Sequence, residues 1–213
     1  MQLSLNGTSG LMMTPTADLA ADRKLAAGAS FVDKKWAVDY RDRFDNVAYF
    51  ATLGYLPRVE LSMRVTVFPG SSFSLDDPDR SQKDRMFSIK FQPLEETGHW
   101  PALALGSEDI TGTRRFHTLF AVASKGLSLG RAGPIRLHLG AGTDWIDAKN
   151  YPLYGVFGGF EKTLWRGGEL LAEYDTDKVN LGLRVEPVSY VTLLLSALNV
   201  ESFGAAVHVN LSL

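Results

Sequence analysis

The chain has 213 residues, no cysteine and a net charge of −2, which fits one domain without disulfides or zinc–thiolate sites. Nucleic acid is not expected as a partner, because nonspecific binding needs enough basic side chains to displace counterions. No run of 18 or more apolar residues occurs, so a transmembrane helix is excluded. No linker rich in Ser, Pro or acidic residues interrupts the chain, and a single domain over residues 1–213 is expected.

Residues 1–24 precede the first segment with a clear pattern. Residues 1–6 lack the basic and apolar regions of a secretion signal, so either the chain is not exported or the sequence is that of a mature form with an added Met. A mature, exported chain is the expectation that fits an outer-membrane barrel. Residues 17–29 contain helix formers, but their glycine and scattered charges fit a loop equally well. We expect this N-terminal segment to lie partly inside a barrel or to form a loop.

Alternation of apolar and polar residues dominates the rest of the chain and predicts β-strands. The cleanest example is 58–68, where Val59, Leu61 and Met63 alternate with polar neighbours. The final segment repeats this pattern over eleven residues, which is rare in a helix. In chain order, the predicted strands are 25–33, 46–56, 58–68, 85–93, 101–109, 116–125, 135–142, 152–164, 168–176, 179–185, 190–199 and 203–213.

The connections between these segments differ in length. Those at 56–58, 165–168 and 199–202 are tight, whereas 69–83 and 144–151 are long and polar. Short turns at one end and long loops at the other are typical of outer-membrane barrels. The fold class expected is therefore all-β, a closed up-and-down antiparallel transmembrane β-barrel of about twelve strands, with ten or fourteen as alternatives.

A soluble lipocalin-like barrel or sandwich would show the same alternation with its apolar face turned inward. Its polar face would then meet water and carry many Lys and Glu residues, whereas here that face is rich in Arg, Ser, Thr, Asn and Gly. Strands of nine to eleven residues also match a tilted membrane crossing. Aromatic residues suited to an interfacial belt lie near strand ends, at Tyr49, Tyr55, Phe68, Phe91, Trp145, Tyr154, Trp165 and Tyr190.

A lumen lined by charged residues of both signs follows from this arrangement. Two interpretations of it stay open: a salt-bridge network that fills the barrel, and a polar conduit for an anionic glycan bound by Arg side chains. With so little chain left over, we expect wall side chains to fill the lumen or leave a narrow path. The candidate lumen-lining residues are Arg58, Glu60, Arg64, Lys90, Arg136, His138, Glu173, Arg184 and His208, with Glu108, Glu161 and Asp175 on the same face.

Catalytic chemistry is weakly indicated. His138 and His208 could act as bases and Ser124 as a nucleophile in a membrane-embedded hydrolase, but no Gly-x-Ser-x-Gly motif occurs. Asp76, Asp77 and Asp79 lack the Gly and Glu of an EF-hand loop. We expect no enzyme, no catalytic residue, no cofactor and no metal.

Several segments resemble the YjbH family of outer-membrane proteins associated with exopolysaccharide production. The most specific are a Gly-Leu-x-x-x-Pro-x-Ala motif at 10–17 and a Glu-Tyr-Asp…Asn-x-Gly-x-Arg motif at 173–184. Together the similar segments cover most of residues 7–185: they are 7–17, 55–61, 64–66, 84–91, 101–106, 122–125, 172–175 and 180–184.

The resemblance implies a bacterial outer-membrane location and a link to envelope polysaccharide, with the chain as one minimal barrel. Export of exopolysaccharide or a narrow polar pore is the first functional hypothesis. A structural or interaction barrel with a self-plugged lumen is the second, and a hydrolase is the third. Expected partners are outer-membrane lipid, an anionic polysaccharide, and the barrel assembly machinery during biogenesis.

Overall fold

The computed structural model describes all residues except 37–43, 70–81, 113–115, 129, 131–132, 144 and 146–152. The described residues form twelve β-strands and one short 3-10 helix, η1 (Lys34–Trp36). Among them, no helix is long and apolar enough to cross a membrane. The strands are β1 (Lys24–Val32), β2 (Asn46–Leu56), β3 (Val59–Phe68), β4 (Gln82–Leu94), β5 (Ala102–Gly112), β6 (Thr118–Ser128), β7 (Pro134–Thr143), β8 (Gly155–Trp165), β9 (Gly168–Tyr174), β10 (Val179–Val188), β11 (Val191–Leu198) and β12 (Ser202–Ser212).

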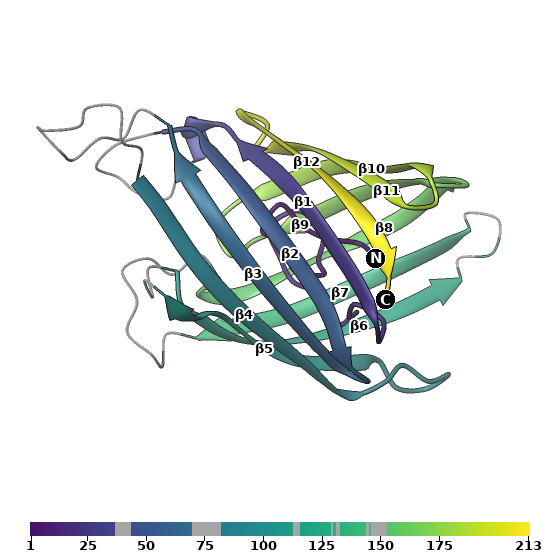
Figure 1. Ribbon diagram of the computed structural model, residues 1–213. Coiled ribbons are helices and arrows are strands. Elements are labelled where there is room, and N and C mark those ends of the chain that lie inside the picture. The colour runs from purple at the N-terminus through teal and green to yellow at the C-terminus, as the bar shows by residue number, and fades with distance from the viewer. Residues whose placement is uncertain are drawn as a thin grey trace, which may run out of the picture.

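All twelve strands pair with their sequence neighbours, and β1 pairs with β12 to close the sheet (Figure 1). Closure is continuous along β1, from Lys24 opposite Ser212 to Val32 opposite Gly204. Each pairing is antiparallel, so the fold is a closed up-and-down barrel. The prediction of an all-β closed barrel of about twelve strands is confirmed.

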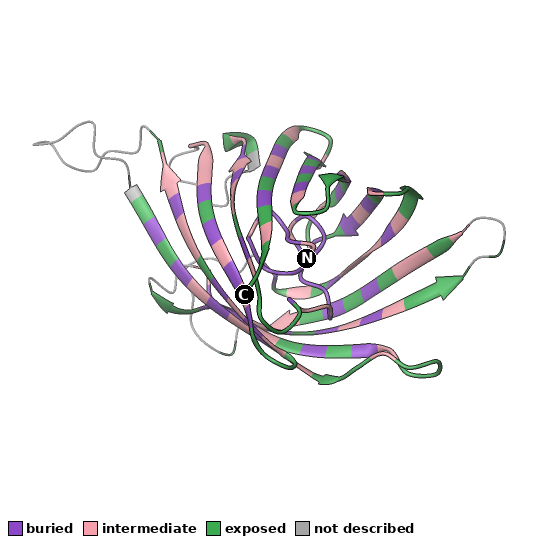
Figure 2. Ribbon diagram, turned by 45° about the vertical axis from the view of Figure 1, so that its right-hand side comes forward, coloured by how far each residue is buried: buried purple, intermediate pink, exposed green. Residues whose placement is uncertain are grey.

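Charged and polar side chains face the lumen on most strands and apolar side chains face outward, although apolar residues such as Phe120, Phe157 and Leu194 face inward in clusters with the N-terminal residues. On β3, Glu60 is 1% exposed, whereas Met63 is 56% exposed. On β12, His208 is 1% exposed between two outward valines. This alternation runs round the wall as bands of buried and exposed residues (Figure 2). It is the reverse of a soluble barrel, which buries apolar residues and exposes polar ones.

Aromatic residues are prominent on the outer surface. Seven of the eight belt candidates are more than 45% exposed: Tyr49, Tyr55, Phe91, Trp145, Tyr154, Trp165 and Tyr190. Phe68, at the end of β3, is only partly exposed. Large rings that are this exposed on an outward face are available to the surroundings of the barrel.

Three details differ from the sequence-based expectations. Arg58 does not belong to a strand, because Pro57 and Arg58 form the two-residue turn between β2 and β3, with Arg58 at a φ of 70°. The turn at 199–201 connects an odd strand to an even one, so it lies at the same end as the long connections. Strand β8 begins at Gly155 rather than at 152. The acidic positions 76, 77 and 79 lie outside the described residues.

Candidate functional site

Residues 1–23, which we call the plug, precede the wall; residues 1–20 lie inside the barrel, and the exposed residues 21–23 lead into β1 (Figure 1). Leu3, Leu11 and Met12 are completely buried there. The plug is compact, since it makes its own backbone hydrogen bonds, such as Leu5 N–H to Met12 C=O at 2.8 Å. The lumen is therefore filled by this segment as well as by wall side chains. The small number of residues outside the strands had led us to expect wall side chains to fill it.

Apolar contacts hold the plug against two parts of the wall. Leu5, Leu11 and Met12 pack with residues of β1, β9, β11 and β12, including Leu171 and Leu194. Further along the chain, Ala17 belongs to a second cluster with β5, β6 and β8. Glycines in the wall make room for these side chains. A Cβ atom added at Gly182 would lie 2.5 Å from Met12 Sδ, so a larger residue there would force the Met12 side chain to shift.

Two buried carboxylates of the wall accept hydrogen bonds from the plug backbone. Glu173, on β9, accepts the N–H groups of Met12, Met13 and Thr14 at 3.0, 2.7 and 3.2 Å. Across the lumen on β3, Glu60 accepts the N–H groups of Ser9 and Ala20 at 2.9 and 2.7 Å. Hydrogen bonds to ionised groups are stronger than neutral ones, so these two residues are the main negative anchors of the plug.

Two buried cations bind plug carbonyl groups in the same way. Lys90 Nζ, on β4, donates to Ser9 O at 2.7 Å and to Thr16 O at 3.1 Å, and lies 3.6 Å from Glu60. On β10, Arg184 donates to Gly10 O at 2.7 Å and to Leu11 O at 3.2 Å. Buried charges are tolerated when they are paired and hydrogen-bonded. Here the partners include backbone groups of the plug.

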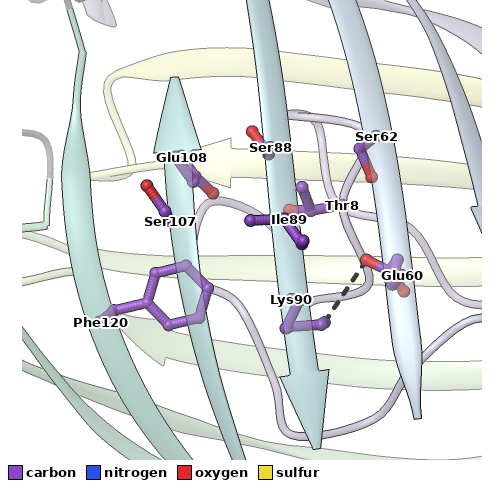
Figure 3. A pocket seen from close by; sticks show the side chains of 9 residues that line it. All are labelled: Thr8, Glu60, Ser62, Ser88, Ile89, Lys90, Ser107, Glu108 and Phe120. Carbon is purple, nitrogen blue, oxygen red and sulfur yellow. Dashed lines mark ion pairs between the residues drawn. The ribbon is translucent and has the colours of Figure 1, made fainter. Parts of the chain in front are cut away.

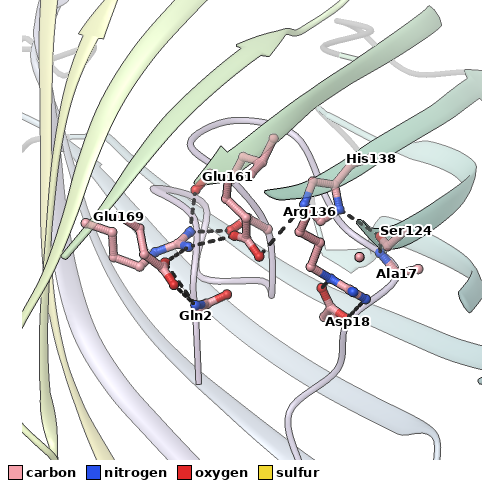
Figure 4. A network of polar contacts seen from close by, with 12 residues as sticks. Gln2, Ala17, Asp18, Ser124, Arg136, His138, Glu161 and Glu169 are labelled. Atoms are coloured by element: carbon pink, nitrogen blue, oxygen red, sulfur yellow. Dashed lines mark hydrogen bonds and ion pairs between the residues drawn. The ribbon is translucent and has the colours of Figure 1, made fainter. Parts of the chain in front are cut away.

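Arg184 also joins the wall to itself. Its second terminal nitrogen lies 3.2 Å from Glu161 and 3.1 Å from Glu169 (Figure 4). Glu169 in turn accepts two hydrogen bonds from the Gln2 side chain of the plug at 2.9 Å. The sequence-based salt-bridge network therefore exists, but it includes plug residues that no strand pattern identified.

At the lumen rim, Arg136 on β7 binds Asp18 of the plug through two hydrogen bonds of 2.7 and 2.6 Å. It also donates to Glu96, in the β4–β5 connection, at 2.6 Å. Burial alone would raise the pKa of Glu96, but hydrogen bonds from Arg136 and the Gly126 N–H, with the charges of Arg136 and Lys125, outweigh it and lower that pKa. The Glu96 carboxylate is thus ionised well below neutral pH.

The lumen histidines also contact the plug. His208 Nε2 lies 3.0 Å from Met1 O. The Nδ1 atom of His138 lies 2.7 Å from Ser124 Oγ, and this oxygen accepts the Ala17 N–H at 2.8 Å (Figure 4). Glu161 Oε1 lies 4.0 Å from the other ring nitrogen. The residues of a Ser-His-acid group are adjacent, yet Ser124 is only 1% exposed and covered by the plug.

The structure places eight of the nine predicted lumen-lining residues in the barrel interior and one on its surface. Arg58 is the exception: it is exposed at its turn and pairs with Glu95 at 3.0 Å. Arg64 binds Asn6 of the plug. Sequence reasoning missed Asp18 and Gln92, whose roles depend on plug contacts and not on strand periodicity. It also left out Asn180, which donates to Glu173 and Asp175 inside the wall.

A small cavity remains between the plug and strands β3 to β6. It has a volume of about 10 Å³ and is lined by Thr8 of the plug and by wall residues that include Glu60, Lys90 and Glu108 (Figure 3). This is room for about one water molecule. A sugar residue does not fit there while the plug is in place.

Comparison with known proteins identifies relatives. Residues 3–152 match the YjbH family, described as exopolysaccharide biosynthesis protein YbjH. The chain is 30% identical over 143 residues to the "Uncharacterized lipoprotein YjbH" of Escherichia coli (strain K12). This match covers 66% of the chain and 18% of that relative, so the chain spans less than a fifth of the relative's length. The matched region contains the plug and strands β1 to β7, and the chain belongs to the YjbH family.

Proposed function

We propose that this chain is an outer-membrane β-barrel that serves exopolysaccharide export, with its lumen closed by the plug. The observation that carries the membrane part is the reversed burial of the wall. Charged residues such as Glu60 and Arg184 are 1% exposed, while Met63, Leu139 and Val156 are more than 55% exposed. An apolar outer band with a polar interior is the pattern of barrels that face lipid.

Closure of the sheet supports the same location. In hydrocarbon, each unpaired backbone N–H or C=O group costs several kcal/mol, so an open sheet edge is not tolerated. The pairing of β1 with β12 leaves no such edge among the twelve described strands. The exposed aromatic residues fit the interfacial belts of such barrels. Lipid of the outer membrane is accordingly the first proposed partner, and the barrel assembly machinery is proposed to insert the chain.

The link to exopolysaccharide comes from the family, whose description names exopolysaccharide biosynthesis. The name of the Escherichia coli relative adds that it is a lipoprotein, which is consistent with an envelope location. An anionic polysaccharide is the proposed cargo, because guanidinium groups bind carboxylates in a bidentate manner. In the plugged structure, however, Arg64, Arg136 and Arg184 already bind partners of the chain itself.

Passage of a glycan therefore requires the plug to move, and the structure corresponds to a closed state. The wall binds the plug mainly through its backbone, with Glu60, Lys90, Glu173 and Arg184 as the anchors. We propose no enzymatic role, because a substrate cannot reach Ser124 while Ala17 covers it. Absence of ester hydrolysis by the purified chain would agree with this; hydrolysis lost in Ser124→Ala would contradict it.

Heat-modifiable migration tests the membrane barrel. Purified chain in detergent is run on SDS gels with and without boiling, and we expect the unboiled sample to migrate differently because a closed barrel resists SDS. Cell fractionation of the host bacterium should place the chain in the outer membrane. A chain that is monodisperse without detergent would contradict the proposal. Loss of surface exopolysaccharide on deletion of the gene, restored by the intact chain, tests the export role.

A further inference from the structure

Three potential metal ligands from three separate segments meet beside the plug. Asp18 belongs to the plug, His138 to β7 and Glu161 to β8 (Figure 4). One ligand atom from each lies within 4.8 Å of the other two. Two carboxylates and one imidazole form a donor set that first-row transition cations, Zn²⁺ in particular, accept readily.

The Nε2 atom of His138 supports a cation site independently of this cluster. The residue is 4% exposed, and Nε2 has no hydrogen-bond partner among the described residues. Glu161 Oε1 lies 4.0 Å from it, which is beyond hydrogen-bond distance. Buried polar atoms in proteins almost always have a partner. A buried imidazole nitrogen without a hydrogen bond, beside two carboxylates, is therefore a position where a cation would bind all three groups.

Neighbouring groups orient each of the three ligands. Ser124 Oγ is placed to accept the Nδ1–H of His138, which leaves the lone pair of Nε2 free for a cation. Metal-binding histidines commonly donate their other N–H to an oxygen in this way. Arg136 holds the Asp18 carboxylate through two hydrogen bonds, and Arg184 holds Glu161 by Oε2, so Oε1 faces His138.

We propose that Asp18, His138 and Glu161 form a binding site for a divalent transition cation, with Zn²⁺ as its best occupant, which links the plug to the wall. Bonds of about 2.0–2.2 Å to a tetrahedral Zn²⁺ place the ligand atoms about 3.3–3.5 Å apart. Since these atoms now lie within 4.8 Å of one another, the side chains must close by at most about 1.5 Å to bind the cation. Asp18, whose side chain is 39% exposed, provides the entry side, and water completes the coordination there.

Zinc binding to the full-length chain tests the site. The protein is folded in detergent micelles, stripped with a chelator and dialysed against ZnCl₂. We expect one Zn²⁺ per chain. Glu161→Gln keeps the shape of the side chain and can still accept from Arg184, yet it should weaken binding by more than about 100-fold, because even second-shell changes cost about 10- to 100-fold. His138→Ala should do the same, whereas His99→Ala, which removes an exposed imidazole outside the cluster, should bind like the wild type.

Amide hydrogen exchange provides the second readout. Zn²⁺ should slow exchange in the plug around Asp18 in the wild type and leave it unchanged in Glu161→Gln, while Mg²⁺, which prefers all-oxygen octahedral sites, should have no effect. Heat-modifiable migration confirms that each variant is folded. Equal Zn²⁺ affinity in the wild type and both ligand variants would overturn the site, as would the absence of bound Zn²⁺ in folded wild type. Neither result bears on the membrane or export proposal.

Discussion

Glu173 is the residue on which the plug depends most directly. It accepts four hydrogen bonds from Met12, Met13 and Thr14, and a fifth from Asn180 at 3.0 Å. Glu173 is only 2% exposed, so these protein groups take the place of water around its carboxylate. A carboxylate in this position replaces the water that would otherwise solvate three adjacent N–H groups of an irregular segment.

Replacing Glu173 by Ala should therefore loosen the plug before it affects the wall. One buried donor left without a partner costs about 1–3 kcal/mol, so amide exchange at residues 12–14 should accelerate by about 10-fold or more. Hydrogen exchange followed by mass spectrometry measures this. The matched control is Glu201→Ala in the exposed β11–β12 turn, which should leave exchange in the plug unchanged. Unchanged exchange in folded Glu173→Ala would show that the plug is held by other contacts.

Glu96 makes the stability of the contact at the lumen rim depend on pH. Because its pKa in the folded chain is lowered, its contact with Arg136 contributes stability above the ordinary glutamate pKa of 4.5 and loses it as pH falls through the lower, folded-state value. The side chain is 27% exposed, and the contribution should be below about 1 kcal/mol after solvent screening. We expect the free energies of urea unfolding of the wild type and Glu96→Gln to differ more at pH 7 than at pH 3. An equal difference at both values would contradict this assignment.

At the scale of elements, the strands could be predicted because their pattern is local. Period-two alternation identified four strands clearly, and turn residues bounded the less regular segments, including 46–56, whose limits agree with β2. The pattern failed where local geometry interrupts it: Arg58 continues the alternation of 58–68 in sequence, but the Pro57–Arg58 turn places it outside the lumen. Alternation also cannot show which of two faces meets lipid.

The plug illustrates what a local pattern cannot supply. Its position is set by partners far away in sequence, as Ser9 and Glu60 are 51 residues apart and Met12 and Glu173 are 161 apart. No periodicity in residues 1–23 encodes those contacts. The Glu-Tyr-Asp…Asn-x-Gly-x-Arg motif did contain two of the four anchors, Glu173 and Arg184, together with Asn180, which donates to Glu173.

Gly159 on β8 tests the packing between strands and plug. A Cβ atom there would lie 2.3 Å from Ala172 O of β9 and 2.6 Å from Leu11 Cδ1 of the plug. Because the first contact is with backbone, Gly159→Ala should destabilise the barrel by about 1–3 kcal/mol, as overpacking does. Urea unfolding in micelles, followed by tryptophan fluorescence, measures this. Gly98→Ala, in the β4–β5 connection with no atom within 4 Å of an added Cβ, should change stability by less than about 0.5 kcal/mol.

At the scale of the whole molecule, the wall is apolar outside and the anchored plug fills the lumen, so we expect a barrel without an open pore. In a planar bilayer, the intact chain should insert and stay silent, because apolar contacts of Leu11 and Met12 and the buried anchors on opposite walls hold the plug across the lumen. Removing the two negative anchors, in Glu60→Ala combined with Glu173→Ala, leaves Lys90 and Arg184 as the only buried anchors of the four.

This double variant should show brief ohmic steps at least about ten times more often than the wild type, since a loss of 1.4 kcal/mol already shifts an opening equilibrium tenfold. Arg58→Ala is the control, because it removes a charge from the exposed β2–β3 turn without a contact to the plug. Steady conductance of the intact chain would show that the plug does not seal the lumen. A silent double variant that still migrates as a folded barrel would show that Lys90, Arg184 and the apolar contacts suffice to keep it closed, and that the carboxylates orient the plug without latching it.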